Sequence, residues 1–322
     1  ATSANGGTVA VTNDGGFSYL PAVGFKGTDS FAYTISDANG GSNSATATIF
    51  VGNLVWYVNN GGANGDGRQT TPLNSFTGIN GAGGAGDADG TNDFIYLFPG
   101  SGSYGSALVL ESAQQLIGAG VALVVGGTTI YPAGSRPTLG SGGAGVTCST
   151  NNLIQGLQIV ATAGPGVSGT GVGTLTITNV SIAATGGAAL DIDTGTLAVT
   201  LDSASSTNSS AEGLRLNNVG GSFVAGVGGI SASTGAGILM NGGAASVTFG
   251  GSVTKNNAGR VVDISNKTGG TVALNGALAQ NFATGMGISL ANNTGATINF
   301  AGAISLNTSA NAAFSATGGG TV

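Results

Sequence analysis

Two short acidic motifs hold the residues of this sequence best suited to chemistry. Asp191 and Asp193 flank Ile192 in an alternating stretch, which predicts a strand that buries the isoleucine and turns both carboxylates toward solvent. Two carboxylates on one face can serve as acid and base in the cleavage of a glycosidic bond. Asp191 and Asp193 are therefore the candidate catalytic pair.

The second motif is the glycine-rich loop GDADGTND, which contains Asp87, Asp89 and Asp93. Carboxylate and carbonyl oxygens spaced along a tight loop are the ligands that Ca²⁺ prefers. No Glu closes the loop as it would in an EF-hand, and a solvated turn rich in Asp and Gly is the alternative interpretation. The three aspartates are the candidate metal site, and calcium is the only cofactor that the sequence suggests.

The composition removes most other chemistry. The 322 residues include no His, one Cys, 13 Asp and Glu, and 7 Lys and Arg. Without His, the Ser-His-Asp and Cys-His nucleophiles and the commonest zinc ligand are excluded. A net charge of −6 argues against nucleic-acid partners, and no run approaches the roughly 20 apolar residues that span a bilayer. Cys148 is expected to fill space in the core.

A repeat of 22 to 26 residues organises the chain from Gly173 onward. Each unit contains a first apolar strand, a short second strand, and a third strand that ends in Asn or Asp, which predicts one solenoid coil per unit in a three-sheet parallel β-helix. The pairs expected to stack in the first strand are Leu175/Ile177, Leu197/Val199, Val247/Phe249, Val272/Leu274 and Ile298/Phe300. Those in the third strand are Leu190/Ile192, Leu214/Leu216, Ile238/Met240, Val262/Ile264 and Ile288/Leu290.

This register bears on the acidic pair. It places Arg215 beside Asp191 on the next coil and Asn217 beside Asp193. The simplest interpretation of Asp191 and Arg215 is a solvated salt bridge, and no further acid, base or cation cluster lies nearby to support catalysis. The Asn residues that recur at the coil corners are expected to form side-chain ladders and to accept a left-handed backbone. They are Asn217, Asn218, Asn241, Asn266, Asn292 and Asn293.

Residues 1–52 have a different texture. The alternating runs TVAVT, FSY, SFAYTIS and ATATIFV, separated by the turns NDGG and DANGG, predict about four strands. An immunoglobulin-like sandwich needs about seven strands. The segment is therefore expected to be a partial Ig-like β-sandwich that cannot bury both of its faces.

The run from NGGTVAVTNDGGFSYLP through FKGTDSFAYTISDANGG resembles the C-terminal half of the cadherin-like, Ig-like (VCBS-type) repeats of very large bacterial surface proteins. In that family the domain is a spacer or adhesive module, so the resemblance implies a role without catalysis. Farther along, LVWYVNN, DFIYLFPG and QQLIGAG resemble the opening and N-terminal cap of right-handed parallel β-helices in secreted bacterial proteins.

These observations predict an all-β chain: a partial Ig-like domain at 1–52, the opening and cap of a right-handed three-sheet β-helix at 53–140, and regular coils at 141–322. The expected function is that of a non-catalytic structural or adhesive protein at the bacterial cell surface, outside the cell. The alternative is a carbohydrate-active β-helix, either a polysaccharide lyase or a glycoside hydrolase.

The expected partners follow from the half domain at one end and the GGGTV that opens a new coil at the other. A second copy bound head to tail in a filament would complete both units, and so would flanking parts of a longer chain. Surface glycans are a further expected partner, whereas nucleic acid and membrane insertion are not expected.

Overall fold

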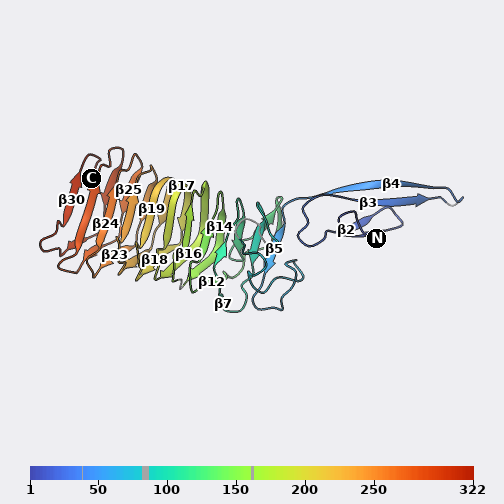
Figure 1. Ribbon diagram of the computed structural model, residues 1–322, viewed down its shortest axis with the longest axis horizontal. Helices are drawn as coiled ribbons and strands as arrows, with labels where there is room; N and C mark the ends of the chain where they lie inside the picture. Colours follow the sequence, from blue (N-terminus) through green and yellow to red (C-terminus); the bar gives the residue numbers. More distant parts are fainter. Residues whose placement is uncertain (38, 82–86, 161–162) are drawn as a thin grey trace.

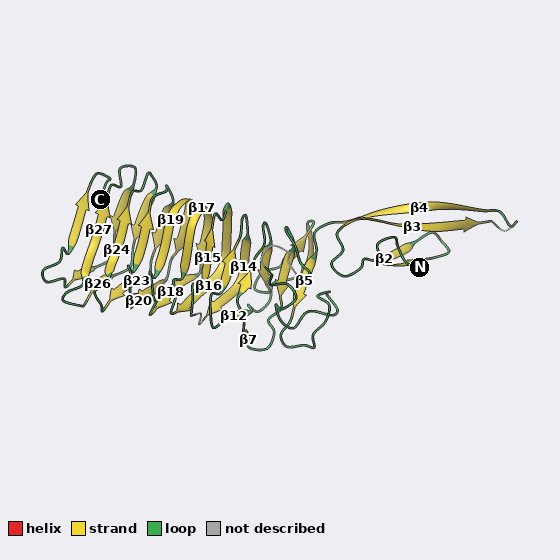
Figure 2. Cartoon of the chain, viewed as in Figure 1, coloured by secondary structure: helices red, strands yellow, loops and turns green. Residues whose placement is uncertain are grey.

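The computed structural model describes residues 1–37, 39–81, 87–160 and 163–322, and within these residues every regular element is a β-strand (Figures 1 and 2). The chain forms an elongated stack of coils, with the N-terminal hairpins extending from one end and β30 at the other (Figure 1). The prediction of an all-β chain, with an Ig-like domain followed by a β-solenoid, is confirmed. The solenoid has about nine turns from residue 94 onward.

The solenoid strands form three parallel sheets, in which each strand away from the two ends of the stack pairs with the strands of the coils before and after it. Sheet 1 contains β5 (Val55–Val58), β6 (Phe94–Leu97), β9 (Gln115–Gly118), β22 (Ser246–Phe249), β25 (Thr271–Leu274) and β28 (Thr297–Phe300). Sheet 2 contains β7 (Ser103–Tyr104), β12 (Thr138–Gly140), β18 (Ser203–Thr207), β20 (Gly228–Ser231), β23 (Ser252–Lys255), β26 (Leu278–Gln280) and β29 (Ile304–Leu306). Sheet 3 contains β8 (Leu108–Val109), β13 (Val146–Cys148), β15 (Val167–Thr170), β21 (Ile238–Asn241), β24 (Arg260–Ser265), β27 (Met286–Ala291) and β30 (Phe314–Thr317).

Four long strands bend around a corner and belong to two sheets. β14 (Leu153–Val160) and β16 (Thr174–Thr185) run from sheet 1 into sheet 2. β17 (Leu190–Leu201) and β19 (Leu214–Ala225) run from sheet 3 into sheet 1. At the second kind of corner the backbone is left-handed at Thr194, Asn218, Asn266 and Asn292 (φ between 50° and 62°). Asn tolerates this conformation better than most residues, which explains its recurrence there.

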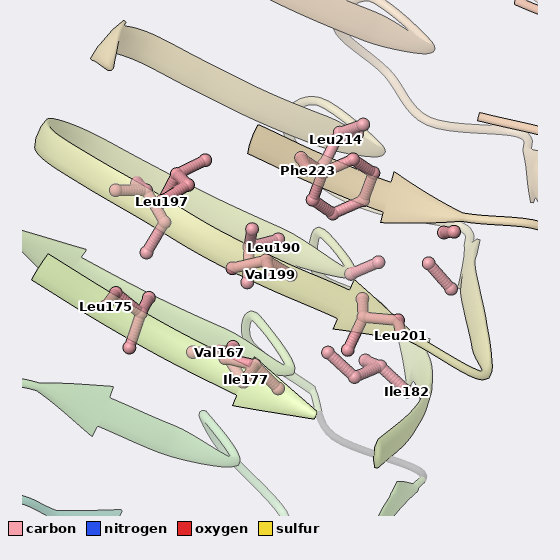
Figure 3. Packing of buried hydrophobic residues seen from close by; sticks show 14 of the residues in the cluster. Val167, Leu175, Ile177, Ile182, Leu190, Leu197, Val199, Leu201, Leu214 and Phe223 are labelled. Carbon is pink, nitrogen blue, oxygen red and sulfur yellow. The ribbon is translucent and has the colours of Figure 1, made fainter. Parts of the chain in front are cut away.

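The core is a continuous column of apolar, mostly aliphatic side chains inside the three sheets, and Figure 3 shows part of it. The stacking predicted for the third strand is confirmed, with Ile192 beside Leu216 and Met240 beside Ile264. Partners on successive coils are 22 residues apart at Thr176 and Ala198 and 26 apart at Val272 and Ile298, as the repeat predicts. Alternating residues thus fill one interior without a break.

The predicted stacking of the first strand is wrong between the coil of Leu197 and the coil of Val247, where the alignment is displaced by two residues. Val199 lies beside Phe223, and Phe223 beside Val247, so Val247 does not belong over Leu197. The cause is Gly221, the partner of Leu197, which has a positive φ of 79° and no room for a side chain, because a Cβ there would lie 2.1 Å from the Leu197 carbonyl oxygen. The apolar run in that coil therefore begins two residues later.

A second, smaller apolar cluster lies outside the solenoid core near its first coils. The hairpin of β10 (Leu123–Val125) and β11 (Thr128–Tyr131) brings Tyr131 onto outward-facing aromatic residues of sheet 1. The rings of Tyr96 and Tyr131 stack with centroids 5.4 Å apart, and Tyr57 packs edge-on against both. This hairpin covers an apolar face that would otherwise be exposed.

The N-terminal segment contains the four expected strands as two antiparallel hairpins. β1 (Thr8–Val11) pairs with β2 (Phe17–Leu20), and β3 (Gly27–Ser36) pairs with β4 (Ser42–Val51). Asp29 joins the hairpins because it accepts hydrogen bonds from Ser3 Oγ at 2.5 Å and Tyr19 Oη at 2.7 Å. Burial would raise the pKa of Asp29, but these bonds outweigh it and hold the pKa well below its usual range.

Candidate functional sites

The structure brings Asp191 and Asp193 together around one guanidinium. Arg215 Nη1 lies 2.7 Å from Asp191 Oδ1, and its Nη2 lies 3.2 Å from Asp193 Oδ2. Asn217 donates a hydrogen bond to Asp193 Oδ1 at 2.7 Å. The hydrogen bond to Asp191, and then that to Asp193, raise the pKa of Arg215. The predicted pairing of Asp191 with Arg215 is confirmed, and both carboxylates are already engaged by cationic or amide donors.

Asp191 and Arg215 line a shallow hollow of about 390 Å³ on sheet 3. Its other polar lining comes from Thr147, Ser168 and Thr170 on the two preceding coils. Cys148 also lines it, but burial raises the pKa of its thiol to about 12, so the sulfur stays protonated and is a poor nucleophile. The lining is polar, but the described residues offer the hollow no acid, base or nucleophile beyond Asp191, whose carboxylate is bound to Arg215.

Asp193 is also the first member of a ladder of hydrogen-bonded side chains, which runs from coil to coil along the corner between sheets 3 and 1. Asn217 donates to Asp193, Asn241 donates to Asn217 at 2.8 Å, and Asn266 donates to Asn241 at 2.9 Å. Asn292 continues the series toward Asn266 at 3.5 Å. The predicted Asn ladder is confirmed for Asn217, Asn241, Asn266 and Asn292, whereas Asn293 donates instead to the carbonyl oxygen of Ile264 at 2.9 Å. It gives Asp193 a structural partner on the adjacent coil.

Asp93 is fully buried and saturated with hydrogen bonds. Its Oδ1 accepts from Leu54 N at 2.9 Å and Lys26 Nζ at 3.0 Å, and its Oδ2 accepts from Trp56 Nε1 and Gly90 N, both at 3.1 Å. Lys26 belongs to the Ig-like segment, whereas Trp56 lies in the first solenoid strand. Asp93 is therefore the polar centre of the joint between the two parts, and no acceptor position on it remains for a metal ion.

Asp87 and Asp89 differ from Asp93 because each leaves one oxygen unused. Asp87 Oδ2 accepts from Gly81 N at 2.6 Å, and Asp89 Oδ2 accepts from Gln114 Nε2 at 2.7 Å. The Oδ1 atoms of both are buried and have no hydrogen-bond partner among the described residues. Burial, followed by the charges of Asp87 and Glu111, raises the pKa of Asp89 to about 7.

The calcium site therefore remains a prediction. Asp87 and Asp89 remain its candidate ligands, whereas Asp93 does not. Within the described residues, no group of three or more His, Cys, Asp or Glu side chains is placed to hold a metal ion. The spacing in GDADGTND could not reveal that Asp93 turns toward Lys26 and Trp56, because those partners are far away in the sequence.

Two buried lysines were not anticipated from the sequence. Lys255 donates from Nζ to the carbonyl oxygens of Ser233 and Gly235, and Lys267 donates to the carbonyl oxygen of Ala245 at 3.0 Å. Both side chains are almost fully buried. Lysines are normally exposed, and the sequence carries no signal for the corner carbonyls that bind them.

Apolar surface is exposed at both ends of the molecule. An open groove of about 710 Å³ lies between the two N-terminal hairpins. Its apolar lining residues are Val11, Phe17, Phe31, Tyr33, Ile35 and Ala47. Ile35 is 64% exposed, and in the last coil Ile304 and Phe314 are each 44% exposed. Monomeric proteins rarely leave such sets of apolar strand residues uncovered.

Fold and sites together define a bacterial-type Ig-like segment joined to a parallel β-solenoid. Residues 1–50 match a family model described as a bacterial Ig domain. The match covers the two hairpins and does not distinguish the cadherin-like class. Searches of curated proteins and of solved structures found no match. Among the described residues there is no helix of the length and apolar character needed to cross a membrane.

Proposed function

We propose that this chain is a non-catalytic structural or adhesive rod of the bacterial cell exterior. The observation that carries the proposal is the unbroken parallel pairing from Val55 in β5 to Thr317 in β30. Each coil is hydrogen-bonded to its neighbours and packed on one core, which makes the stack stiff along its length. The bacterial Ig match at residues 1–50 supports an exterior location.

We further propose that copies of the chain associate head to tail, with flanking parts of a longer chain as the alternative occupant of the same surfaces. β28, β29 and β30 pair with the preceding coil, and among the described residues only Thr321 bridges the far edge of β28. Unpaired strand edges with apolar side chains are templates for another chain, and the groove between the hairpins accepts strands of that kind. Because these surfaces lie at opposite ends (Figure 1), their contact is heterologous and extends a filament.

Electron microscopy and light scattering of the purified chain test both statements. The wild-type chain is expected to form fibres as its concentration rises. The double variant Tyr33→Ser, Ile35→Ser is expected to remain a monomeric rod with the same circular dichroism spectrum. Val227→Ser is the matched control, because Val227 is 59% exposed but lies on a turn outside both surfaces. Monomeric wild-type rods at every concentration would contradict head-to-tail association.

The hollow over Asp191 and Arg215 favours the alternative, a carbohydrate-active β-helix acting as a polysaccharide lyase or glycoside hydrolase. A screen of acidic and neutral polysaccharides, with and without calcium, separates the two functions. The rod proposal expects no turnover by the wild type. Turnover that disappears in Asp191→Asn, Asp193→Asn while the protein stays folded would replace it with an enzymatic function.

A further inference from the structure

The most unusual polar feature outside the sheet 3 hollow is the pair of unused oxygens beside the joint. Asp89 is 8% exposed, and its Oδ1 has no hydrogen-bond partner among the described residues; the same is true of Asp87 Oδ1. A buried acceptor that has lost its water and gained no donor is destabilising, and native proteins rarely contain two together.

We propose that Asp87 Oδ1 and Asp89 Oδ1 bind one divalent cation, calcium, which makes the joint between the Ig-like segment and the solenoid rigid. Both atoms are hard oxygen donors, and Ca²⁺ accepts carboxylates singly, with backbone carbonyls and water completing six to eight ligands. The site has two carboxylates rather than three. Mg²⁺ fits less well because it needs a near-ideal octahedron.

The charge balance supports a cation at this place. Asp87 and Glu111 lie close enough to Asp89 for their charges to act on it, and the ammonium of Lys26 is bound to Asp93 and to the Thr91 carbonyl oxygen. A calcium ion there would neutralise Asp87 and Asp89, which form no ion pair with a Lys or Arg side chain in the part of the chain that the structure describes.

The proposed site is coupled to the joint through hydrogen bonds. Gln114 Nε2 donates to Asp89 at 2.7 Å and to the Gly90 carbonyl oxygen at 3.1 Å. The amide of Gly90 in turn donates to Asp93, which holds Lys26. Fixing Asp89 therefore fixes the loop that carries Asp93, so calcium is expected to stabilise the contact between the Ig-like segment and the first solenoid strand.

Calorimetric titration and thermal melts with calcium chloride test the site. The wild type, stripped with chelator, is expected to bind one Ca²⁺ and to gain about 3 to 8 °C in Tm at saturating calcium. Asp87→Asn and Asp89→Asn should each weaken binding at least about tenfold, because each removes one of the two charges. Asp263→Asn is the matched control, since Asp263 is a half-buried acid paired with Arg260 on sheet 3. It should bind as the wild type does.

Hydrogen exchange locates the effect. Calcium should raise protection at Leu54, Trp56 and residues 89–93 while leaving β17 unchanged. Absence of calcium binding by the folded wild type would overturn the proposal, and so would equal binding by Asp89→Asn. If stability instead rises as the pH falls through about 7 and calcium adds nothing, a shared proton satisfies the two oxygens and the metal site is excluded. None of these outcomes depends on filament formation.

Discussion

Lys26 Nζ and Asp93 Oδ1 lie 3.0 Å apart and join the Ig-like segment to the solenoid, although they are separated by 67 positions in the chain. The two partners are unequal. The lysine side chain is one-third exposed, whereas the aspartate is fully buried and also accepts hydrogen bonds from two backbone amides and an indole. Asp93 therefore organises the joint, and Lys26 contributes one of its four donors.

We expect Asp93→Ala to lower the free energy of unfolding by about 3 to 5 kcal/mol, because it leaves several buried donors without an acceptor. Lys26→Met should lower it by less than about 1 kcal/mol, since its partly exposed ammonium is screened by water. Denaturant melts followed by circular dichroism and by Trp56 fluorescence measure both changes. Equal losses for the two variants would show that the ion pair, rather than the hydrogen-bond network, holds the joint.

The Asn ladder gives a second prediction. Asn241 donates to Asn217 Oδ1 and accepts from Ser265 Oγ and Asn266 Nδ2. Asn241→Ala should therefore lower stability by about 1 to 2 kcal/mol. Asn241→Asp should lower it at least as much, because a carboxylate would face Asn217 Oδ1 without a proton to donate. If Asn241→Ala melts as the wild type does, the ladder is a consequence of the fold and does not stabilise it.

The core gives a third prediction. Phe223 is fully buried in β19, where it lies between Val199 and Val247 of the neighbouring coils. Phe223→Ala should lower the free energy of unfolding by about 3 to 5 kcal/mol through the cavity that it opens. Phe282→Ala is the control, because Phe282 is 43% exposed and its loss should matter by less than about 1 kcal/mol. Denaturant midpoints of the two variants measure the difference.

The register of a strand is predictable from the sequence where the alternation of apolar residues allows only one of its faces to be buried. In sheet 3 the alternation around Leu216 and Met240 leaves a single register, and the corner Asn residues mark where each strand ends. The same method fails at Gly221, because glycine adds nothing to an apolar pattern. The coil that contains Phe223 therefore contributes no pair to the predicted series, and Val247 is aligned with Leu197 instead of Val199. The periodicity of a sequence depends on its side chains, so it gives no information on the strand register at a glycine, which has no side chain.

The candidate sites were less predictable because their partners are distant or are backbone atoms. The pairing of Asp191 with Arg215 follows from the repeat length, since they occupy one column on adjacent coils. The partners of Asp93 come from two other segments, and no local spacing relates Lys26 or Trp56 to it. A buried lysine is harder still to predict, since Lys255 binds carbonyl groups that every residue possesses.

Lys255 gives the last prediction, which concerns pH. Burial lowers the pKa of its amine to about 8, and the charge of Glu212 only partly opposes this. In the unfolded chain a lysine titrates near about 10.4, so between about pH 8 and pH 10 the unfolded state binds more protons than the folded state. The free energy of unfolding should therefore rise with pH across this window. Buried Lys267, whose pKa is also lowered by burial, should add to the rise.

Denaturant melts of the wild type and of Lys255→Met across that window test the assignment. The variant should show a smaller rise, because only Lys267 then contributes. At neutral pH it should be less stable than the wild type, since the carbonyl oxygens of Ser233 and Gly235 lose their donor. Lys26→Met is the control and should keep the full rise. A fall in wild-type stability over this pH range, or an unchanged rise in Lys255→Met, would show that the amine is not held in the low-dielectric interior.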